Sequence, residues 1–416
     1  MRRPWVIGCL ALFACDGFAV DQDERCEALN QSMHDCLGEG FPEISCAGMS
    51  DADIETFVDG VEDSECEYWR DALPQDGDLR ASYCRLYDDG CAAARNPAPA
   101  KAPTRYPVLM VNGIDVSFAF RYSDRIFYVM REVAGHDVRF AIVPPYDATT
   151  RRAARLWQHV QDVKAETGAE KVNLICHSLG GLDCRYLVSP GGLHWEVEAT
   201  HEEIVGSVAS VSMVSTAHRG TRVADAALGA LPHADRREAL DSIATFVGEW
   251  FTEEALEQDV DLRASVAALS TTQARAFNAQ IVDAAGVYYQ SWGGFSRPFG
   301  SDSASHDERL AEVCTLDDGT VAVSTFAGEH DYLATSLLPS YEMVGREDDA
   351  RPDDIEPNDG LCTIASAKWG RFRGCIPIDH MEQLGQLNLP DANVRTGFDV
   401  AFFYANIATE LAGMGY

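Results

Sequence analysis

Short apolar runs alternate with amphipathic segments through the middle of the chain. The runs at Val108–Asn112, Asp137–Val143 and Val172–Ile175 have the length and residue types of buried strands. Between them, Ser123–Ala134 and Thr149–Thr167 place apolar residues at helical spacing. Helices that separate apolar strands cover both faces of a mostly parallel sheet. The pattern therefore predicts an α/β fold with functional side chains at the carboxyl ends of the strands.

The alternation continues toward the C-terminus, with one long interruption. Further strands are predicted at Ile204–Ser215, Val287–Trp292 and Gly360–Ile364. The segment 221–277 is too long for a simple connection, and helices are predicted in it at Ala224–Leu231, Asp235–Phe251 and Thr271–Ile281. Two interpretations stay open for this segment: a lid over an apolar active site, or an ordinary helical insertion. The polar, acidic stretches 302–318 and 345–358 are predicted as loops.

The stretch Lys171–Leu187, KVNLICHSLGGLDCRYL, combines a strand, a sharp turn and a helix. This is the context in which a G-x-S-x-G match indicates a nucleophilic serine, here Ser178. Gly180 and Gly181 supply the small residues that a close approach of strand and helix requires. Cys176 stands where the motif has its first glycine, and it is small enough for that position.

A serine hydroxyl needs a neighbouring base, and the base needs an orienting carboxylate. In this type of sheet the chain order is Ser, then Asp or Glu, then His. Ser178, Asp359 and His380 follow that order, with Asp359 beside the last predicted strand. His177 and His218 are competing bases. The side chain of His177 should point away from the adjacent hydroxyl and bind the scaffold, and His218 should pack near the site without relaying protons.

Two backbone amides are expected to stabilise the negative charge that develops on the substrate oxygen. One belongs to Leu179, the residue after the nucleophile. The other belongs to Ile114, in the loop Asn112-Gly113-Ile114 after the first strand, where Gly113 permits a tight approach.

The net charge and the N-terminal sequence indicate which partners are excluded and where the protein is located. The 416-residue chain has a formal net charge of -33, which argues against nucleic acid as a partner, because phosphate binding requires clustered Lys and Arg. Residues 1–19 have a basic start and a short apolar core, as signal peptides do. Cleavage before Val20 would release the protein, and lipidation of Cys15 would anchor it. We therefore expect a secreted or cell-envelope-attached protein.

The chain divides by composition into three parts after the leader. Residues 20–95 form an acidic region with helical patterns, and six cysteines in it predict a small disulfide-rich domain: Cys26, Cys36, Cys46, Cys66, Cys84 and Cys91. Their pairing stays open. Residues 96–106 are a Pro/Ala linker, and residues 107–416 form the catalytic domain.

The chain from Tyr106 to Gln386 resembles the bacterial true lipases, typified by Pseudomonas and Burkholderia triacylglycerol lipases. The resemblance is carried by motifs in one order: YPVLMVNGI, VNLICHSLGGLDCRY, STAHRGTRVAD, LSTTQARAFNAQ, YYQSWGG, NDGL and DHMEQLGQ. It implies an α/β-hydrolase fold, a mobile lid and carboxylester hydrolysis. It also implies Ser178, Asp359 and His380 as the triad, with Ile114 and Leu179 as oxyanion donors.

The resemblance further implies a structural calcium near the histidine loop, while catalysis itself needs no cofactor. The matching positions are Glu382, two residues after His380, the upstream acid Asp331, and a backbone carbonyl at Gln386. Glu382 stands where the family has Asp, which leaves retention of the ion open.

Three departures from the family also matter. Asn112 replaces a His, Cys176 replaces a Gly, and the N-terminal domain has no counterpart. The family disulfide has a cysteine before the YYQSWGG strand, whereas Cys314 lies after it. On geometric grounds we predict a bridge from Cys314 to Cys362 or Cys375.

Together these features predict a secreted serine esterase or lipase with an ester or lipid substrate and lid contact with a lipid interface. The same triad could serve a polyesterase or an acyltransferase. A non-catalytic surface-binding protein on a hydrolase scaffold is a third interpretation. Some of these lipases need a dedicated folding chaperone, and the sequence leaves that partner open.

Overall fold

The computed structural model describes residues 31, 96–115, 120–230, 261–298, 304–322, 331–346, 355–385, 393 and 396–416. The chain divides into two compact units, Met1–Ser82 and Tyr83–Tyr416. The leader, the domain 20–95 apart from Gln31, and the predicted helix Asp235–Phe251 lie outside the described residues and stay predictions.

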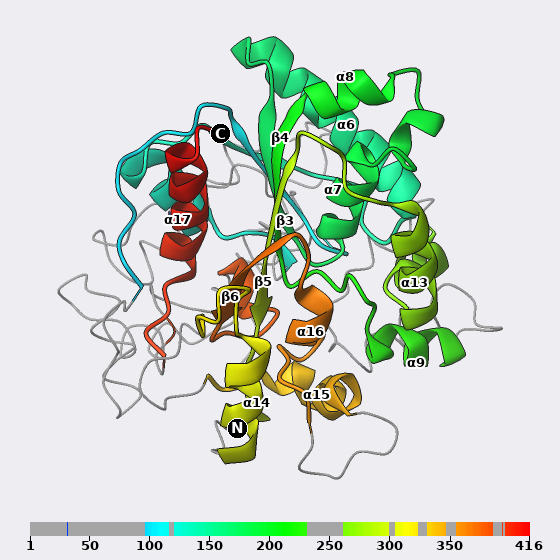
Figure 1. Cartoon of the computed structure of the whole chain (residues 1–416), viewed down its shortest axis with the longest axis vertical. Coiled ribbons are helices and arrows are strands. Elements are labelled where there is room, and N and C mark those ends of the chain that lie inside the picture. Colours follow the sequence, from blue (N-terminus) through cyan, green and yellow to red (C-terminus); the bar gives the residue numbers. More distant parts are fainter. Residues whose placement is uncertain are drawn as a thin grey trace, which may run out of the picture. The chain divides into compact units, whose positions relative to one another are not determined.

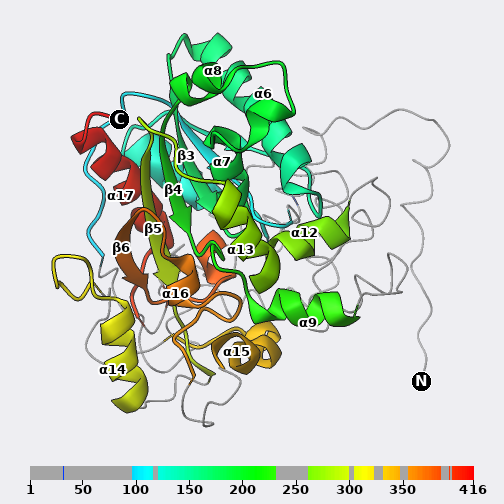
Figure 2. The same cartoon turned by 45° about the vertical axis from the view of Figure 1, so that its right-hand side comes forward.

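A parallel sheet forms the centre of the second unit (Figures 1 and 2). Its strands in the described part of the chain are β1 (Val108–Val111), β2 (Val138–Ala141), β3 (Val172–His177), β4 (Val208–Val214), β5 (Tyr288–Gly294) and β6 (Arg371–Ile376). Their order is β2-β1-β3-β4-β5-β6, and every neighbouring pair is parallel. This confirms the predicted parallel α/β sheet.

Helices cover both faces of this sheet. The helical segments are α5 (Asp124–Tyr128), the π-helix η3 (Val129–Val133), α6 (Thr149–Thr167), α7 (Gly180–Val188), η4 (Leu193–Trp195), α8 (His201–Gly206), α9 (Arg222–Ala230), α12 (Leu262–Ala268), α13 (Thr271–Gln280), α14 (Ala304–Val313), η6 (Thr335–Leu337), α15 (Leu338–Gly345), α16 (Ile364–Ala367), η7 (Glu382–Leu384) and α17 (Val400–Gly413). In Figure 1, α17 lies on one side of the strands and α6 and α7 on the other.

Alternation along the strands explains the two layers. Val108 and Met110 pack into the core with α17, whereas Leu109 and Val111 pack into the core with α6 and α7. Successive side chains of a strand point to opposite faces, so an unbroken apolar run fits a strand that is covered on both sides. The combination of this sheet with the strand–turn–helix at Ser178 is the α/β-hydrolase fold that the resemblance implied.

Two of the predicted strands were misplaced. Ile204 lies in α8, not in a strand, because Thr200 and Glu203 form a capping box that begins a helix, and β4 begins only at Val208. Gly360–Ile364 is not a strand either. Residues 360–363 form a turn with one isolated bridge between Asn358 and Thr363, and Ile364 begins α16.

The prediction also missed regular structure elsewhere. The last strand is β6, whose alternating charged and apolar residues lie at the edge of the sheet. Part of the predicted loop 302–318 is α14, whose Leu310 packs into a small core with Phe295. The C-terminal helix α17 was not predicted, although it supplies much of one core.

Residues 96–106 are extended and have no regular secondary structure, but they follow α17 closely. Asn96 donates from its side chain to the carbonyl of Asp399, and the Asn406 side chain donates to the carbonyl of Pro97. At the other end of the segment, the Arg105 amide donates to the carbonyl of Tyr416. The predicted linker 96–106 therefore belongs to the second unit and packs along α17.

The predicted insertion 221–277 contains α9, α12 and α13, and its role as a lid stays a prediction. Within the described ranges, none of the helices combines the length and apolarity needed to cross a bilayer.

Two disulfides join described cysteines. Cys314 pairs with Cys375, one of its two predicted partners, whereas Cys362 is buried as a free thiol. The second bridge, between Cys176 and Cys184, was not predicted; it connects the end of β3 to α7.

Candidate active site

Ser178 lies in the sharp turn between β3 and α7. Its φ of 53° is in the left-handed region, which non-glycine residues rarely adopt. The Ser178 amide donates to the carbonyl of Val214 on the neighbouring strand. A Cβ atom at Gly180 would lie 2.5 Å from the carbonyl oxygen of Asn112, so only glycine fits there. The turn therefore has the strained, tightly packed geometry of a nucleophile elbow.

Asp359 and His380 meet through a direct hydrogen bond. Nδ1 of His380 lies 2.8 Å from Oδ2 of Asp359, and both side chains are buried. Asp359 also accepts hydrogen bonds from Gln383 Nε2, the Cys362 amide and the Ser215 side chain. Burial opposes the charged form of Asp359, but His380 and these hydrogen bonds outweigh it and lower the pKa of the carboxyl.

His177 connects this pair to the elbow. Its ring centroid lies 4.6 Å from that of His380, and its Nε2 lies 3.1 Å from Oε1 of Gln383. Nε2 of the same Gln383 lies 3.1 Å from Oδ2 of Asp359. Burial, together with His380, lowers the pKa of His177 to about 3, so this ring is neutral near pH 7. The arrangement agrees with a scaffold role for His177.

Gln383 was not predicted as a site residue from the sequence. Its side chain is fully buried and binds both His177 and Asp359. A Cβ at Gly294, at the end of β5, would lie 2.1 Å from Gln383 Nε2. In the sequence, only the position of Gln383 three residues after His380 could have indicated that it belongs to the site.

His218 lies in a separate polar group. Its Nδ1 is 3.2 Å from Nη1 of Arg185, whose guanidinium carbon lies 3.4 Å from the ring centroid of Trp369. Burial and the nearby Arg185 and Arg219 lower the pKa of His218 well below its ordinary value. This environment favours a packing role over proton transfer.

The loop after β1 lies against the elbow. A Cβ at Gly113 would lie 3.2 Å from Cβ of Ser178. Leu179 caps the start of α7. Ile114 follows Gly113 and packs at the edge of the core that contains α17. The two predicted oxyanion donors thus belong to segments that flank Ser178.

A cluster of carboxylates lies beside the histidine loop. Asp331, Asp379 and Glu382 each place an oxygen within 4.8 Å of the others. Nδ2 of Asn393 lies 2.6 Å from Oδ1 of Asp331 and 3.3 Å from both carboxylate oxygens of Glu382. Asp331 and Glu382 were predicted ligands, whereas Asp379 was not, although it directly precedes His380. Gln386 lies outside the described residues.

The donor set fits a hard cation. Burial and repulsion from Asp331 raise the pKa of Asp379 to about 7, and burial raises that of Asp331 to about 6. The pKa of Glu382 is raised well above its ordinary value for the same reasons. Oδ2 of Asp331 is buried without a hydrogen-bond partner among the described residues. Calcium binds such oxygen ligands and would relieve the repulsion among them.

Comparison with known proteins identifies relatives among bacterial lipases. Over 201 residues the chain is 30% identical to a triacylglycerol lipase of Burkholderia plantarii. This alignment covers 45% of this chain and 52% of the relative. It is 29% identical to a triacylglycerol lipase of Vibrio cholerae over 46% of this chain and 63% of the relative. A triacylglycerol lipase of Pseudomonas fragi is 26% identical over 68% of this chain and 89% of its own length.

These similarities confirm the resemblance to bacterial triacylglycerol lipases. The chain spans about half the length of the first curated relatives that it matches. No protein-family model matches it. Among solved structures, EstA from Clostridium botulinum aligns with a TM-score of 0.48 and 17% identity, over 79% of this chain and 93% of that one.

Proposed function

We propose that this chain is a serine carboxylester hydrolase of the lipase type. The observation that carries the proposal is the buried hydrogen bond between His380 and Asp359, next to a turn that holds Ser178 at φ 53°. A serine in such a turn, with a histidine and a carboxylate after it in the chain, is the constellation of acyl transfer in this fold. The similarity to triacylglycerol lipases supports the same reaction.

In the proposed mechanism, Ser178 attacks the carbonyl carbon of an acyl ester while His380 accepts the hydroxyl proton. The amides of Leu179 and Ile114 stabilise the oxyanion of the tetrahedral intermediate. The intermediate collapses to an acyl-enzyme when His380 returns the proton to the departing alcohol. Water, activated by His380, then releases the acid and regenerates Ser178. Asp359 keeps the imidazole oriented and stabilises its protonated form.

The relatives are named triacylglycerol lipases, so we propose acyl esters of lipids as the substrate class. We also propose that the protein is secreted or attached to the cell envelope, because residues 1–19 have the pattern of a signal peptide. We propose that the segment 221–277 acts as a lid that contacts a lipid interface. The neighbouring specificities, polyester hydrolysis and transfer of the acyl group to another alcohol, use the same residues.

The decisive experiment compares wild type with Ser178→Ala on triglyceride, short-chain and polymeric esters. We expect Ser178→Ala to lose about 10⁶ in kcat while it stays folded. A fluorophosphonate should label wild type at Ser178 and leave the variant unlabelled. An undiminished rate in the variant would end the proposal, and an unlabelled wild type would favour the non-catalytic interpretation.

We further propose that Asp331, Asp379 and Glu382 hold a structural calcium. The ion would neutralise the buried carboxylates of Asp331 and Asp379 and the half-buried one of Glu382, and it would fix the loop that carries His380. It would take no part in the chemical steps.

A further inference from the structure

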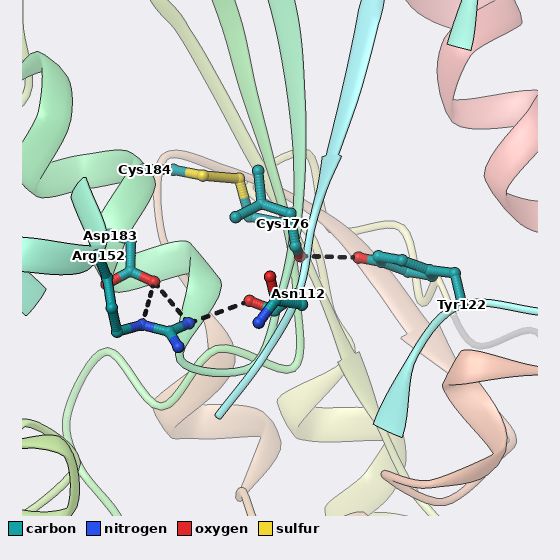
Figure 3. The surroundings of a disulfide bond; sticks show 7 residues. Asn112, Tyr122, Arg152, Cys176, Asp183 and Cys184 are labelled. Carbon is teal, nitrogen blue, oxygen red and sulfur yellow. Dashed lines mark hydrogen bonds and ion pairs between the residues drawn. A yellow bond between two sulfur atoms is a disulfide. The ribbon is translucent and has the colours of Figure 1, made fainter. Parts of the chain in front are cut away.

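Arg152 on α6 and Asp183 on α7 form an ion pair in the interior. Both side chains are fully buried, and Nε of Arg152 lies 2.8 Å from Oδ2 of Asp183 (Figure 3). Both charged groups of a buried pair lose their hydration, which costs free energy. Such a pair therefore contributes little to stability unless its remaining hydrogen-bonding groups find partners. The partners of the guanidinium therefore indicate what the pair is for.

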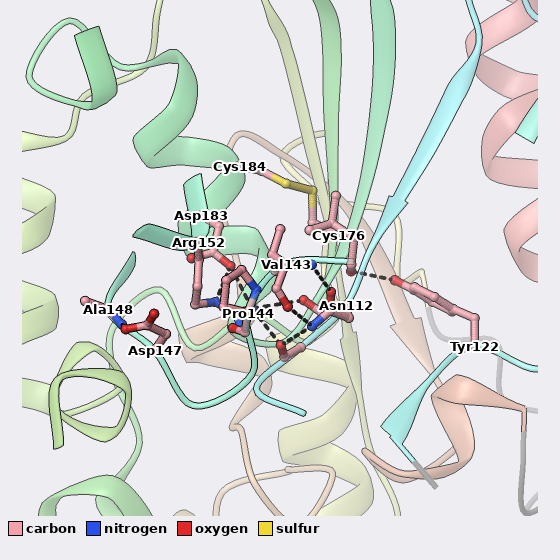
Figure 4. Close-up of polar contacts among 12 residues, drawn as sticks. Asn112, Tyr122, Val143, Pro144, Asp147, Ala148, Arg152, Cys176, Asp183 and Cys184 are labelled. Carbon is pink, nitrogen blue, oxygen red and sulfur yellow. Dashed lines mark hydrogen bonds and ion pairs between the residues drawn. A yellow bond between two sulfur atoms is a disulfide. The ribbon is translucent and has the colours of Figure 1, made fainter. Parts of the chain in front are cut away.

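The other N–H groups of Arg152 bind main-chain carbonyls. Nη2 donates to the carbonyls of Asn112 (3.2 Å) and Gly113 (2.6 Å), and Nη1 donates to that of Pro144 (2.7 Å) (Figure 4). Nδ2 of the Asn112 side chain also donates to the Gly113 carbonyl, at 3.0 Å. The carbonyl oxygen of Gly113 thus accepts two hydrogen bonds, one of them from a charged donor.

These contacts determine the orientation of one peptide group. In a trans peptide the C=O and the following N–H lie in one plane and point in opposite directions. Holding the Gly113 carbonyl toward Arg152 therefore directs the amide N–H of Ile114 away from Arg152. Gly113 itself packs on Ser178, with only 3.2 Å between a Cβ placed on it and Cβ of the serine. The Ile114 amide is the oxyanion donor assigned in the proposed function.

Asp183 links this peptide to the second donor. It lies in the first turn of α7, and its amide donates to the carbonyl of Leu179, whose own amide is the other assigned donor. The next residue, Cys184, is bonded to Cys176 at the end of β3, so the same turn of α7 is also attached covalently to the strand (Figure 3).

We propose that the buried Arg152–Asp183 pair is a positioning element that sets the oxyanion hole by orienting the Gly113–Ile114 peptide relative to α7. The proposal rests on the proposed function. Arg152 and Asp183 are positioning residues, because neither is assigned a contact with substrate. A planar, multi-donor guanidinium suits this role, since a lysine ammonium is a point charge that cannot hold three carbonyls and a carboxylate in one plane.

The test uses the full chain and two variants, Arg152→Lys and Asp183→Asn. Each is measured for kcat, KM, inhibition by an alkyl boronic acid that mimics the tetrahedral intermediate, and thermal unfolding. A misdirected donor should lower kcat by about 10²-fold and weaken boronate inhibition by a similar factor, with KM little changed. Asp183→Glu, which keeps the carboxylate, should recover part of the loss.

The matched control is Glu166→Gln. Glu166 lies on the same helix α6 and pairs with Arg139 at the exposed surface. Its removal should leave kcat and boronate affinity unchanged.

Two results would overturn the proposal. One is a folded Arg152→Lys or Asp183→Asn with wild-type kcat and boronate affinity. The other is failure of both variants to fold, which would assign the pair to stability alone. The proposed function fails separately, if wild type neither hydrolyses esters nor reacts with a fluorophosphonate.

Discussion

The two halves of the candidate site are held together by different means. The elbow side, which comprises β3, α6, α7 and the loop after β1, has a disulfide between Cys176 and Cys184 and a buried ion pair between Arg152 and Asp183. The histidine side, which comprises residues 355–385 and Asp331, places two buried carboxylates and one half-buried carboxylate together. The charges of the Arg152–Asp183 pair cancel, whereas the three clustered carboxylates of the histidine side have the same sign.

This difference predicts which side of the site should lose stability when cations are removed from the solution. The Arg152–Asp183 pair stays intact when ions are removed from the solution, because its positive and negative groups are both part of the chain. Clustered buried carboxylates repel one another unless a cation or protons neutralise them. The histidine side should therefore be the one that is sensitive to cations. Reduction should affect both sides, because Cys375 of the histidine side is bonded to Cys314 and the elbow side has Cys176–Cys184.

The largest expected effect is the loss of kcat on removing the charge of Asp359, the acid of the candidate triad. Asp359→Asn keeps the shape of the side chain but removes the charge that orients His380 and stabilises its protonated form. We expect kcat to fall by about 10⁴-fold with KM nearly unchanged. Steady-state kinetics on a soluble ester, with circular dichroism as the folding control, measure it. A loss below tenfold would mean that another group supplies the charge.

The two disulfides give the next contrast. Removing Cys314–Cys375, which closes a loop of 61 residues, should lower the free energy of unfolding by about 4 kcal/mol. Removing Cys176–Cys184, with a separation of 8, should lower it by about 2–3 kcal/mol. Double Cys→Ala variants of each pair, unfolded in denaturant, test this. The reverse ranking would show that native-state packing outweighs loop closure here.

Cation removal tests the histidine side directly. Saturating calcium, at about 10²–10³ times its dissociation constant, should stabilise the protein by about 3–4 kcal/mol relative to a chelator. Asp331→Asn should abolish the calcium-dependent rise in melting temperature, and Glu166→Gln should keep it. Equal melting temperatures of wild type in calcium and in chelator would contradict the proposed ion.

The last expected effect appears only at acid pH. His177 takes up a proton only near its lowered pKa of about 3, whereas in the unfolded chain it does so near its ordinary value. Between those values the unfolded state binds more protons, so stability falls as the pH falls, by at most about 1.4 kcal/mol per pH unit for this residue. His177→Gln should have a shallower slope in denaturant unfolding between pH 6 and 4, with pH 8 as the baseline. An unchanged slope would show that other groups carry the pH dependence.

Several elements were predictable because their signals are local. Thr149–Thr167 is a helix over the predicted range, since its apolar stripe ends at Gly168, whose φ of 70° allows the helix to terminate there. The elbow at Ser178 was readable because glycines and an apolar strand must adjoin such a turn.

The secondary-structure predictions were wrong where the residue types of a segment favour one structure and its tertiary contacts favour another. Gly360–Ile364 looks like a short strand, but the carboxylate of Asp359 accepts the amides of Leu361 and Cys362 and folds this segment into a turn. β6 contains arginines and a glycine that suggest a loop, yet it pairs with β5 at the sheet edge.

The sequence by itself determined the strands β1 to β5 apart from their exact ends, the long helix α6, the elbow, and the candidate triad, because these depend on residue types and their order along the chain. Only the tertiary structure decided that Cys176 pairs with Cys184, that Gln383 lies between His177 and Asp359, and that Asp379 joins Asp331 and Glu382. It also decided that Arg152 reaches Asp183 and the Gly113 carbonyl. These contacts join segments distant in sequence, and their partners follow from how the helices pack on the sheet.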